Sequence, residues 1–196
     1  MTLTARAVAL TTLLFTAIPF SQAAVIHYGA PLAPELAGAT GTGFVSVDYD
    51  TVANTLLINT NWSGLSGPTT VAHIHCCTAI PGTGTVGVAV TPGTLPGFPV
   101  GVQAGSYTSP LLDLDDPANF TMGFITNFAG GIAANADEAL LAGINANRAY
   151  FNVHSTTFPS GEIRGFLREI PEPATLALLA IGLAGLRLGR RSTDSR

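Results

Sequence analysis

The sequence predicts an all-β protein, an antiparallel β-sandwich or barrel with one or two short helices. Glycine and proline recur about every eight to twelve residues through the middle of the chain, a spacing typical of sandwiches and barrels. The runs between them are short and rich in β-branched and aromatic residues, and several alternate apolar with polar residues. Such alternation indicates strands with one apolar face and one polar face.

The first two strands are expected at residues 43–49 and 54–62, joined by a hairpin-sized loop. Val45, Val47 and Tyr49 share one face of the first strand. The second strand places four alternate residues on one face: Leu56, Ile58, Thr60 and Trp62. Further strands are expected at residues 70–75, 85–90, 106–114, 149–154 and 162–167.

Two helical segments are expected between the strands. Asp116 is a good N-cap and Pro117 suits the first helical position, which predicts a turn or two of helix toward Asn127. Residues 135–146 predict a second helix, because two acidic residues stand in its first turn. We expect the core to contain Leu56, Ile58, Phe151, Val153 and Ile163, together with either Val71 or Val45.

The N-terminal segment has the three parts of a secretory signal peptide. Arg6 provides the positive charge, residues 7–20 are apolar, and Ser21-Gln22-Ala23 is a cleavage site with small residues at its ends. We expect cleavage after Ala23, so residues 1–23 are a signal peptide and the protein is exported.

The C-terminal segment combines a rigid acidic tripeptide, an apolar run and a basic end. Pro171-Glu172-Pro173 precedes a run that begins at Ala174, and arginines follow at 187, 190 and 191. The apolar run up to Leu186 covers only about 20 Å of the ~30 Å hydrocarbon core. If Arg187 snorkels, Leu188 adds to the span. We therefore expect residues 174–188 to enter the membrane transiently.

This tail resembles the PEP-CTERM sorting signal over residues 171–191, leaving 192–196 as a short tail. The resemblance implies an exosortase-like enzyme that cuts near Pro171, Glu172 and Pro173. It also implies passage through the inner membrane to the cell surface or extracellular matrix of a Gram-negative-type bacterium.

Composition limits what the body between these ends, residues 24–170, is expected to bind. About 150 residues suffice for one domain with a core. Eleven of the 12 acidic residues but only three of the 8 arginines lie within residues 24–173, which gives that segment a charge of −8. The chain has no lysine. Nucleic-acid binding needs a basic surface and is not expected, whereas cations and neutral glycans are compatible partners.

The two cysteines, Cys76 and Cys77, are adjacent. They have four possible states: a vicinal disulfide, an intermolecular disulfide, buried thiols or metal ligands. Because export favours oxidation, we predict a vicinal disulfide that acts as a rigid turn beside His73 and His75.

Three histidines form the candidate metal site. His73 and His75 stand two apart on one expected strand and therefore share a face, and His154 lies on a later strand. If the strands are neighbours, the three imidazoles converge as ligands for Zn or Cu, with Glu162 orienting one or joining them. The alternative is three histidines that face solvent or bond loop backbone. Likewise, Glu162 and Arg164 are interpreted as an ordinary charge pair on one strand face.

The body resembles the chordin-type (CHRD) domain from about residue 29 to 167. The resemblance depends on the order of several short motifs: Gly41-Thr42-Gly43, Leu65-Ser66-Gly67, Ala72-His73-Ile74-His75, Leu140-Leu141-Ala142-Gly143, Tyr150-Phe151-Asn152-Val153-His154 and Gly161-Glu162-Ile163-Arg164-Gly165. Cys76-Cys77 departs from the family, where a Gly-Pro type turn is expected. The resemblance implies a secreted protein but does not decide between a binding protein and an enzyme. We expect a non-enzymatic exported protein of binding or structural type, with exopolysaccharide, an extracellular protein or a metal as its partner.

A small redox metalloenzyme is the alternative, because histidines in this order on a β-barrel are also similar to copper–zinc superoxide dismutase. That family needs further ligands, and only His27 is left over here. No nucleophile elbow or phosphate-binding glycine loop is present in the sequence. We therefore expect no enzyme, no catalytic residue and no organic cofactor.

Overall fold

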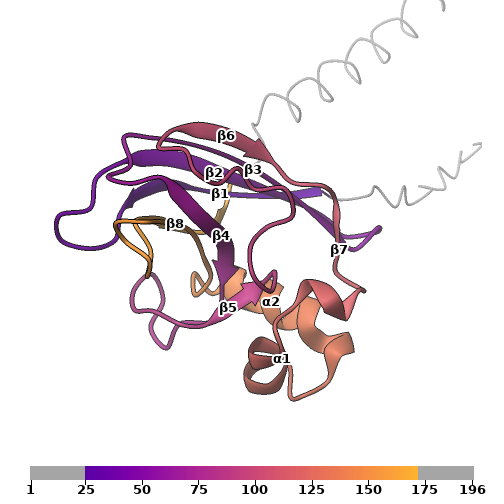
Figure 1. Cartoon of the computed structure of the whole chain (residues 1–196). Helices are drawn as coiled ribbons and strands as arrows, with labels where there is room; N and C mark the ends of the chain where they lie inside the picture. Colours follow the sequence, from indigo (N-terminus) through magenta and orange to yellow (C-terminus); the bar gives the residue numbers. More distant parts are fainter. Residues whose placement is uncertain (1–24, 172–196) are drawn as a thin grey trace, which may run out of the picture.

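The structure is a computed structural model that describes residues 25–171. In this part of the chain, ten antiparallel strands pair into one curled, half-barrel sheet, and two short helices lie together at one end of it (Figure 1). The expected all-β class with one or two short helices is confirmed.

The strands pair in the order β5-β4-β8-β9-β1-β2-β3-β6, with β10 added on β1 and β7 on β3. Their bounds are β1 Val25–Pro34, β2 Thr42–Asp50, β3 Thr55–Ser63, β4 Thr69–His75, β5 Val88–Val90, β6 Gly105–Thr108, β7 Leu112–Asp113, β8 Tyr150–Ser155, β9 Ile163–Phe166 and β10 Arg168–Glu169.

The central strand β1 was not expected from the sequence. Two prolines interrupt its pattern, and proline argues against a central strand because it cannot donate a ladder hydrogen bond. Pro31 lies between the part of β1 that pairs with β10 and the part that pairs with β9, and Pro34 ends the strand. A side chain on Gly165 of β9 would collide with the Pro31 carbonyl, so glycine there allows the two strands to approach.

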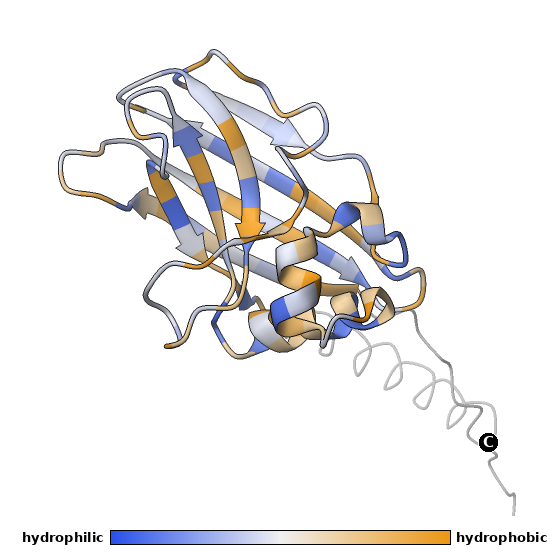
Figure 2. Cartoon of the chain, turned by 60° about the horizontal axis from the view of Figure 1, so that its bottom comes forward, coloured by the Kyte–Doolittle hydropathy of each residue, from blue (hydrophilic) through white to orange (hydrophobic). Residues whose placement is uncertain are grey.

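The hairpin of β2 and β3 matches its expected pattern. Asp50 closes the loop between the strands by accepting hydrogen bonds from the backbone N–H groups of Val52 and Ala53. The inner face of the hairpin is buried as expected: Val45, Val47, Tyr49, Leu56, Ile58, Thr60 and Trp62. Figure 2 shows hydrophobic and hydrophilic residues alternating along the strands.

Strands β4, β8 and β9 supply the other wall of the core. Ala72, Ile74, Phe151, Val153 and Ile163 are fully buried there. Of the two valines expected as alternatives in the core, Val45 is buried and Val71 is only half-buried. The difference follows from alternation, since Val71 shares its face of β4 with the histidines and not with Ala72 and Ile74.

Two expected strands are shorter than predicted. The segment at 106–114 is divided into β6 and β7, because Pro110 interrupts it and Ser109 uses its Oγ to accept the Ile58 N–H. The segment at 85–90 forms strand only at β5. Its earlier part is a loop whose Val86 carbonyl contacts a histidine.

The helices differ from the sequence expectation in one respect. Asp116 caps only a 3₁₀ turn, Pro117–Asn119, and a separate helix α1, Met122–Phe128, has Thr121 as its cap. Helix α2, Ala136–Asn145, lies within the expected range and buries Leu140 and Ile144. Among residues 25–171, no helix is both long and apolar enough to cross a bilayer.

Candidate metal centre

The three candidate histidines come from neighbouring antiparallel strands. Strand β4 carries His73 and His75, β8 carries His154, and the register pairs His73 with Asn152 and His75 with Tyr150. Two-residue alternation then places all three imidazoles on the face of the sheet opposite Ala72, Ile74 and Val153. The histidines are 6%, 8% and 7% exposed, so loops cover this face.

Each imidazole is held by one loop carbonyl. His73 Nε2 lies 2.6 Å from the Gly93 oxygen, His75 Nδ1 lies 2.8 Å from the Val86 oxygen, and His154 Nδ1 lies 2.8 Å from the Pro159 oxygen. A carbonyl only accepts, so each of these ring nitrogens carries the proton in the neutral ring. The other ring nitrogen of each histidine then keeps its lone pair.

Those three remaining nitrogens have no hydrogen-bond partner. His73 Nδ1, His75 Nε2 and His154 Nε2 are buried and unpaired, although buried polar atoms are paired in the large majority of cases. One nitrogen from each histidine contributes to a group whose members all lie within 4.8 Å of one another. The rings also touch, with centroids 5.0 Å apart for His73 and His154 and 5.4 Å apart for His73 and His75.

The environment favours the neutral form of His73 and His75. Burial, with smaller contributions from the nearby His154 and His75, lowers the pKa of His73 to about 4 against the opposing effect of the Gly93 carbonyl. Burial also lowers the pKa of His75, to which the charges of His154 and Arg164 contribute. Neutral imidazole is the form that binds a metal ion, so the arrangement suits a metal such as Zn or Cu.

Glu162 does not lie with the histidines, contrary to its expected role as an orienting group or fourth ligand. Its Oε1 accepts the Ser66 backbone N–H, and the described metal-ligating group holds only the three histidines. Burial raises the pKa of Glu162, but hydrogen bonds from Ser155, Ser66 and Thr40 outweigh it and lower that pKa. Glu162 thus fastens the loop before β4 to the end of β8.

The expected charge pair between Glu162 and Arg164 is also wrong. Arg164 instead pairs with Glu35, with Nη1 3.0 Å from Oε1, and its guanidinium carbon lies 5.0 Å from the Tyr150 ring centre. Asn152 donates a hydrogen bond to the other oxygen of Glu35. The sequence offers no signal for Glu35, because it follows β1 and is brought to β9 only by the sheet pairing.

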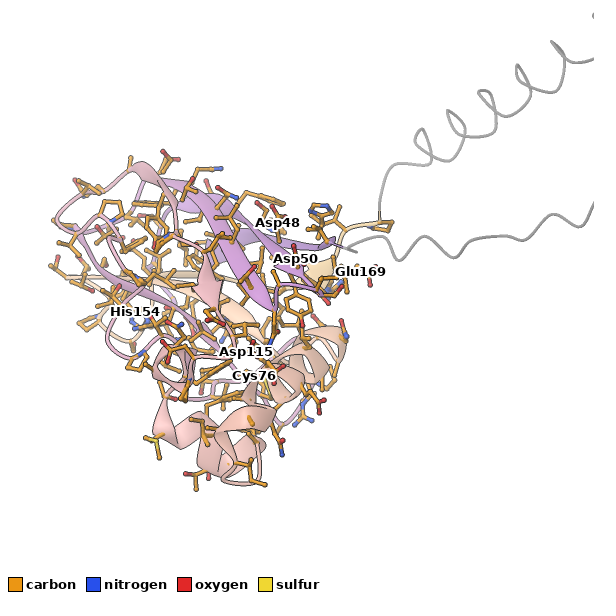
Figure 3. All side chains as sticks on the ribbon, turned by 90° about the vertical axis from the view of Figure 1, so that its right-hand side faces the viewer. Asp48, Asp50, Cys76, Asp115, His154 and Glu169 are labelled. Carbon is orange, nitrogen blue, oxygen red and sulfur yellow. A yellow bond between two sulfur atoms is a disulfide. The ribbon has the colours of Figure 1, made fainter. Side chains whose placement is uncertain are left out.

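The two cysteines are joined as a vicinal disulfide. A side chain at Gly143 of α2 would collide with both Sγ atoms, so the sulfurs face the helix. They belong to the hydrophobic core, on the side of the sheet opposite the imidazoles. Figure 3 shows Cys76 apart from His154. This placement separates the sulfurs from the three unpaired nitrogens.

Most of the predicted processing residues lie outside the described residues. Only Pro171 is described. Ala23, Glu172 and Pro173 fall beyond residues 25–171, as does the expected membrane segment at 174–188.

Comparison with known proteins identifies two parts of the chain. The PEP-CTERM protein-sorting motif matches residues 169–192, so the chain is an exported protein that carries an exosortase sorting signal. The CHRD domain matches residues 22–167, which is more than half of the chain. No curated protein and no solved structure matches. Both the sorting signal and the body therefore agree with the motif order in the sequence, and the chain belongs to the CHRD domain family.

Proposed function

We propose that this is a non-enzymatic binding protein of the cell surface or extracellular matrix, and that its CHRD domain binds a transition-metal ion through His73, His75 and His154. The observation that supports the metal site is the group of three buried histidines, each with a ring nitrogen within 4.8 Å of those of the other two and each with one buried nitrogen that has no hydrogen-bond partner. Leaving a buried polar atom unpaired costs about 1–3 kcal/mol. A metal ion would satisfy all three atoms at once.

The loop carbonyls support the same proposal. A metal-bound histidine usually donates its second ring N–H to a carboxylate or carbonyl, which fixes the tautomer and aims the lone pair. His73, His75 and His154 each have such a carbonyl. The alternative from the sequence was three histidines that face solvent or bond loop backbone. Bonding to loop backbone accounts for one nitrogen of each ring, but it leaves the other nitrogen buried and unpaired.

The surroundings of the protein complete the proposal. After export, an exosortase-like enzyme removes the tail, and the acidic body remains at the surface or in the matrix of a Gram-negative-type bacterium. Exopolysaccharide and extracellular protein are the proposed macromolecular partners, and the charge of −8 for residues 24–173 disfavours nucleic acid.

Metal analysis of the purified, exported protein tests the metal site. We expect about one Zn or Cu per chain after loading, and free metal at about 100 times its Kd should add ~2.7 kcal/mol to the free energy of unfolding. His154→Ala should abolish both effects. His27→Gln is the matched control, because His27 pairs with Asp48 on β2 and is outside the metal-ligating group. Unchanged stability with Zn²⁺, Cu²⁺ and Cu⁺ alike would refute the site.

A redox metalloenzyme at the same centre is the second candidate, since the donor set of three imidazoles suits copper. Assay of the copper-loaded protein for superoxide dismutation separates the two. We expect no rate above that of the His154→Ala protein, and a metal-dependent rate would favour the enzyme.

A further inference from the structure

We propose that the centre formed by His73, His75 and His154 binds Cu⁺ in preference to divalent ions such as Zn²⁺. This inference rests on the proposed function, because it names the ion that the same site takes.

The groups that hydrogen-bond the three imidazoles carry no negative charge. The three available ligand atoms are neutral imidazole nitrogens, and the groups behind them are the carbonyls of Gly93, Val86 and Pro159. Among the described residues, no carboxylate belongs to the cluster. A carboxylate behind a histidine is a common way to offset the charge of a bound dication, and this centre has none.

A paired cation and anion, Arg164 and Glu35, lie beside the centre. Tyr150 stacks on His75 with ring centres 4.7 Å apart, and Arg164 lies 5.0 Å from the same tyrosine ring. Glu35 neutralises Arg164 through the 3.0 Å ion pair. The cation is therefore one aromatic ring away from a ligand, while its partner carboxylate is committed to Arg164 and Asn152.

The remaining acidic groups do not compensate for this. The Oε1 atom of Glu162 accepts the Ser66 backbone N–H and its Oε2 is buried without a hydrogen-bond partner, and neither oxygen belongs to the metal-ligating group. Asp48, Asp50 and Glu169 lie on the side of the molecule away from His154 (Figure 3). The excess negative charge of the body is thus not concentrated at the histidines.

Because the site is buried and has no negative ligand, an ion of low charge costs less to bind there than an ion of high charge. The three histidines are 6–8% exposed, and the cost of moving an ion out of water rises with the square of its charge, so a dication costs about four times as much as a monocation. Imidazole suits both copper and zinc, so the donor atoms do not separate the two metals and the charge of the ion decides between Cu⁺ and Zn²⁺. The cysteines are joined in a disulfide that lies in the core. Their sulfurs are therefore not available as ligands, and the imidazoles are the donors at this centre.

Competition for the metal tests the preference in the purified, exported protein. Cu⁺ is supplied with ascorbate in the absence of oxygen against a chromophoric Cu⁺ chelator, and Zn²⁺ is supplied against a chromophoric Zn²⁺ chelator, both at pH 7.5. We expect Cu⁺ to bind at least about 100-fold more tightly than Zn²⁺. Equal or tighter binding of Zn²⁺ would overturn the preference while leaving the metal centre in place. Binding of neither ion would instead refute the proposed function.

Two opposite substitutions test the electrostatic reason. Glu35→Gln leaves Arg164 without its counter-charge and should weaken Zn²⁺ binding about tenfold or more, whereas Arg164→Gln leaves Glu35 as an uncompensated anion and should strengthen it. The affinity for Cu⁺ should change less in both proteins. Arg168→Gln, an exposed arginine bound to Asn147, is the control. Circular dichroism checks that each variant folds, and Zn²⁺ affinities that respond to neither change would overturn the electrostatic argument.

Discussion

Each of the three histidines gives one ring nitrogen to a loop carbonyl, and this leaves the other nitrogen with a buried lone pair. The sequence predicts which side of the strand carries the histidines, because alternation is a local property. It does not predict the carbonyls. Gly93, Val86 and Pro159 lie in irregular loops, whose paths no periodic pattern reports.

The lowered pKa of His73 predicts that the metal-free protein loses stability in acid. The pKa is about 4 in the folded protein and 6.5 for the unperturbed group, so between these values the unfolded chain takes up a proton that the folded chain does not. The free energy of unfolding is therefore complete above pH 6.5 and should fall by ~3 kcal/mol for His73 alone as the pH approaches 4. His75, whose pKa is also lowered, adds in the same direction.

Denaturant titrations of the metal-free protein at pH 7 and pH 4.5 measure this loss. His73→Gln has no titrating group at this position and should show a smaller difference between the two pH values. Equal pH dependence in His73→Gln and in the unaltered protein would contradict the assigned cause.

Helix α2 and the disulfide are fitted to each other. Gly143 of α2 faces both sulfurs, and a side chain there would collide with them. Gly143→Ala should therefore destabilise the protein by about 1–3 kcal/mol through overpacking. Gly123→Ala in α1 is the matched control, because nothing lies within 4 Å of the added methyl group, and it should be neutral or stabilising by up to ~1 kcal/mol.

Thermal unfolding of the two alanine variants checks this contrast. Similar shifts of Tm in both variants would show that the sulfurs do not set the packing of α2. Metal content should be unchanged in Gly143→Ala, because the disulfide and the imidazoles lie on opposite sides of the sheet.

The elements that were predicted from the sequence are those with clear local periodicity. Strands β2 and β3 alternate regularly and lie where expected. Strand β1 was missed because Pro31 and Pro34 break the alternating pattern that predicts a strand. Its partners, β2 and β9, come from opposite ends of the domain sequence. Glu35 was missed as the partner of Arg164 for the same reason, since that ion pair exists only once β9 pairs with β1.

The whole molecule is an exported CHRD protein with a sorting tail, which predicts the mass of the protein at the cell surface. If both signals are processed, intact-mass analysis of surface-extracted protein should show a chain that starts near Ala24 and ends between Pro171 and Pro173. Recovery of a chain that extends through Arg196 would show that the tail is not removed. The matched variant changes Pro171 and Pro173 to Ala and should retain the tail.

The C-terminal sorting motif and the order of motifs in the body were recognisable from the sequence because both depend on contiguous residues. His73, His75 and His154 converge only if two strands that are far apart in the chain are neighbours in the sheet. The sequence alone does not predict that pairing. The sheet order places β4 beside β8. The same pairing brings Tyr150 against His75 and sets the charges around the centre.

The most direct test of the metal centre is anomalous diffraction from crystals of the copper-loaded protein, with zinc-loaded crystals for comparison. We predict one strong anomalous peak bounded by His73 Nδ1, His75 Nε2 and His154 Nε2, and none at the disulfide or at the acidic residues. A peak at Cys76 and Cys77, or no peak among the three histidines in protein loaded to one metal per chain, would contradict the account.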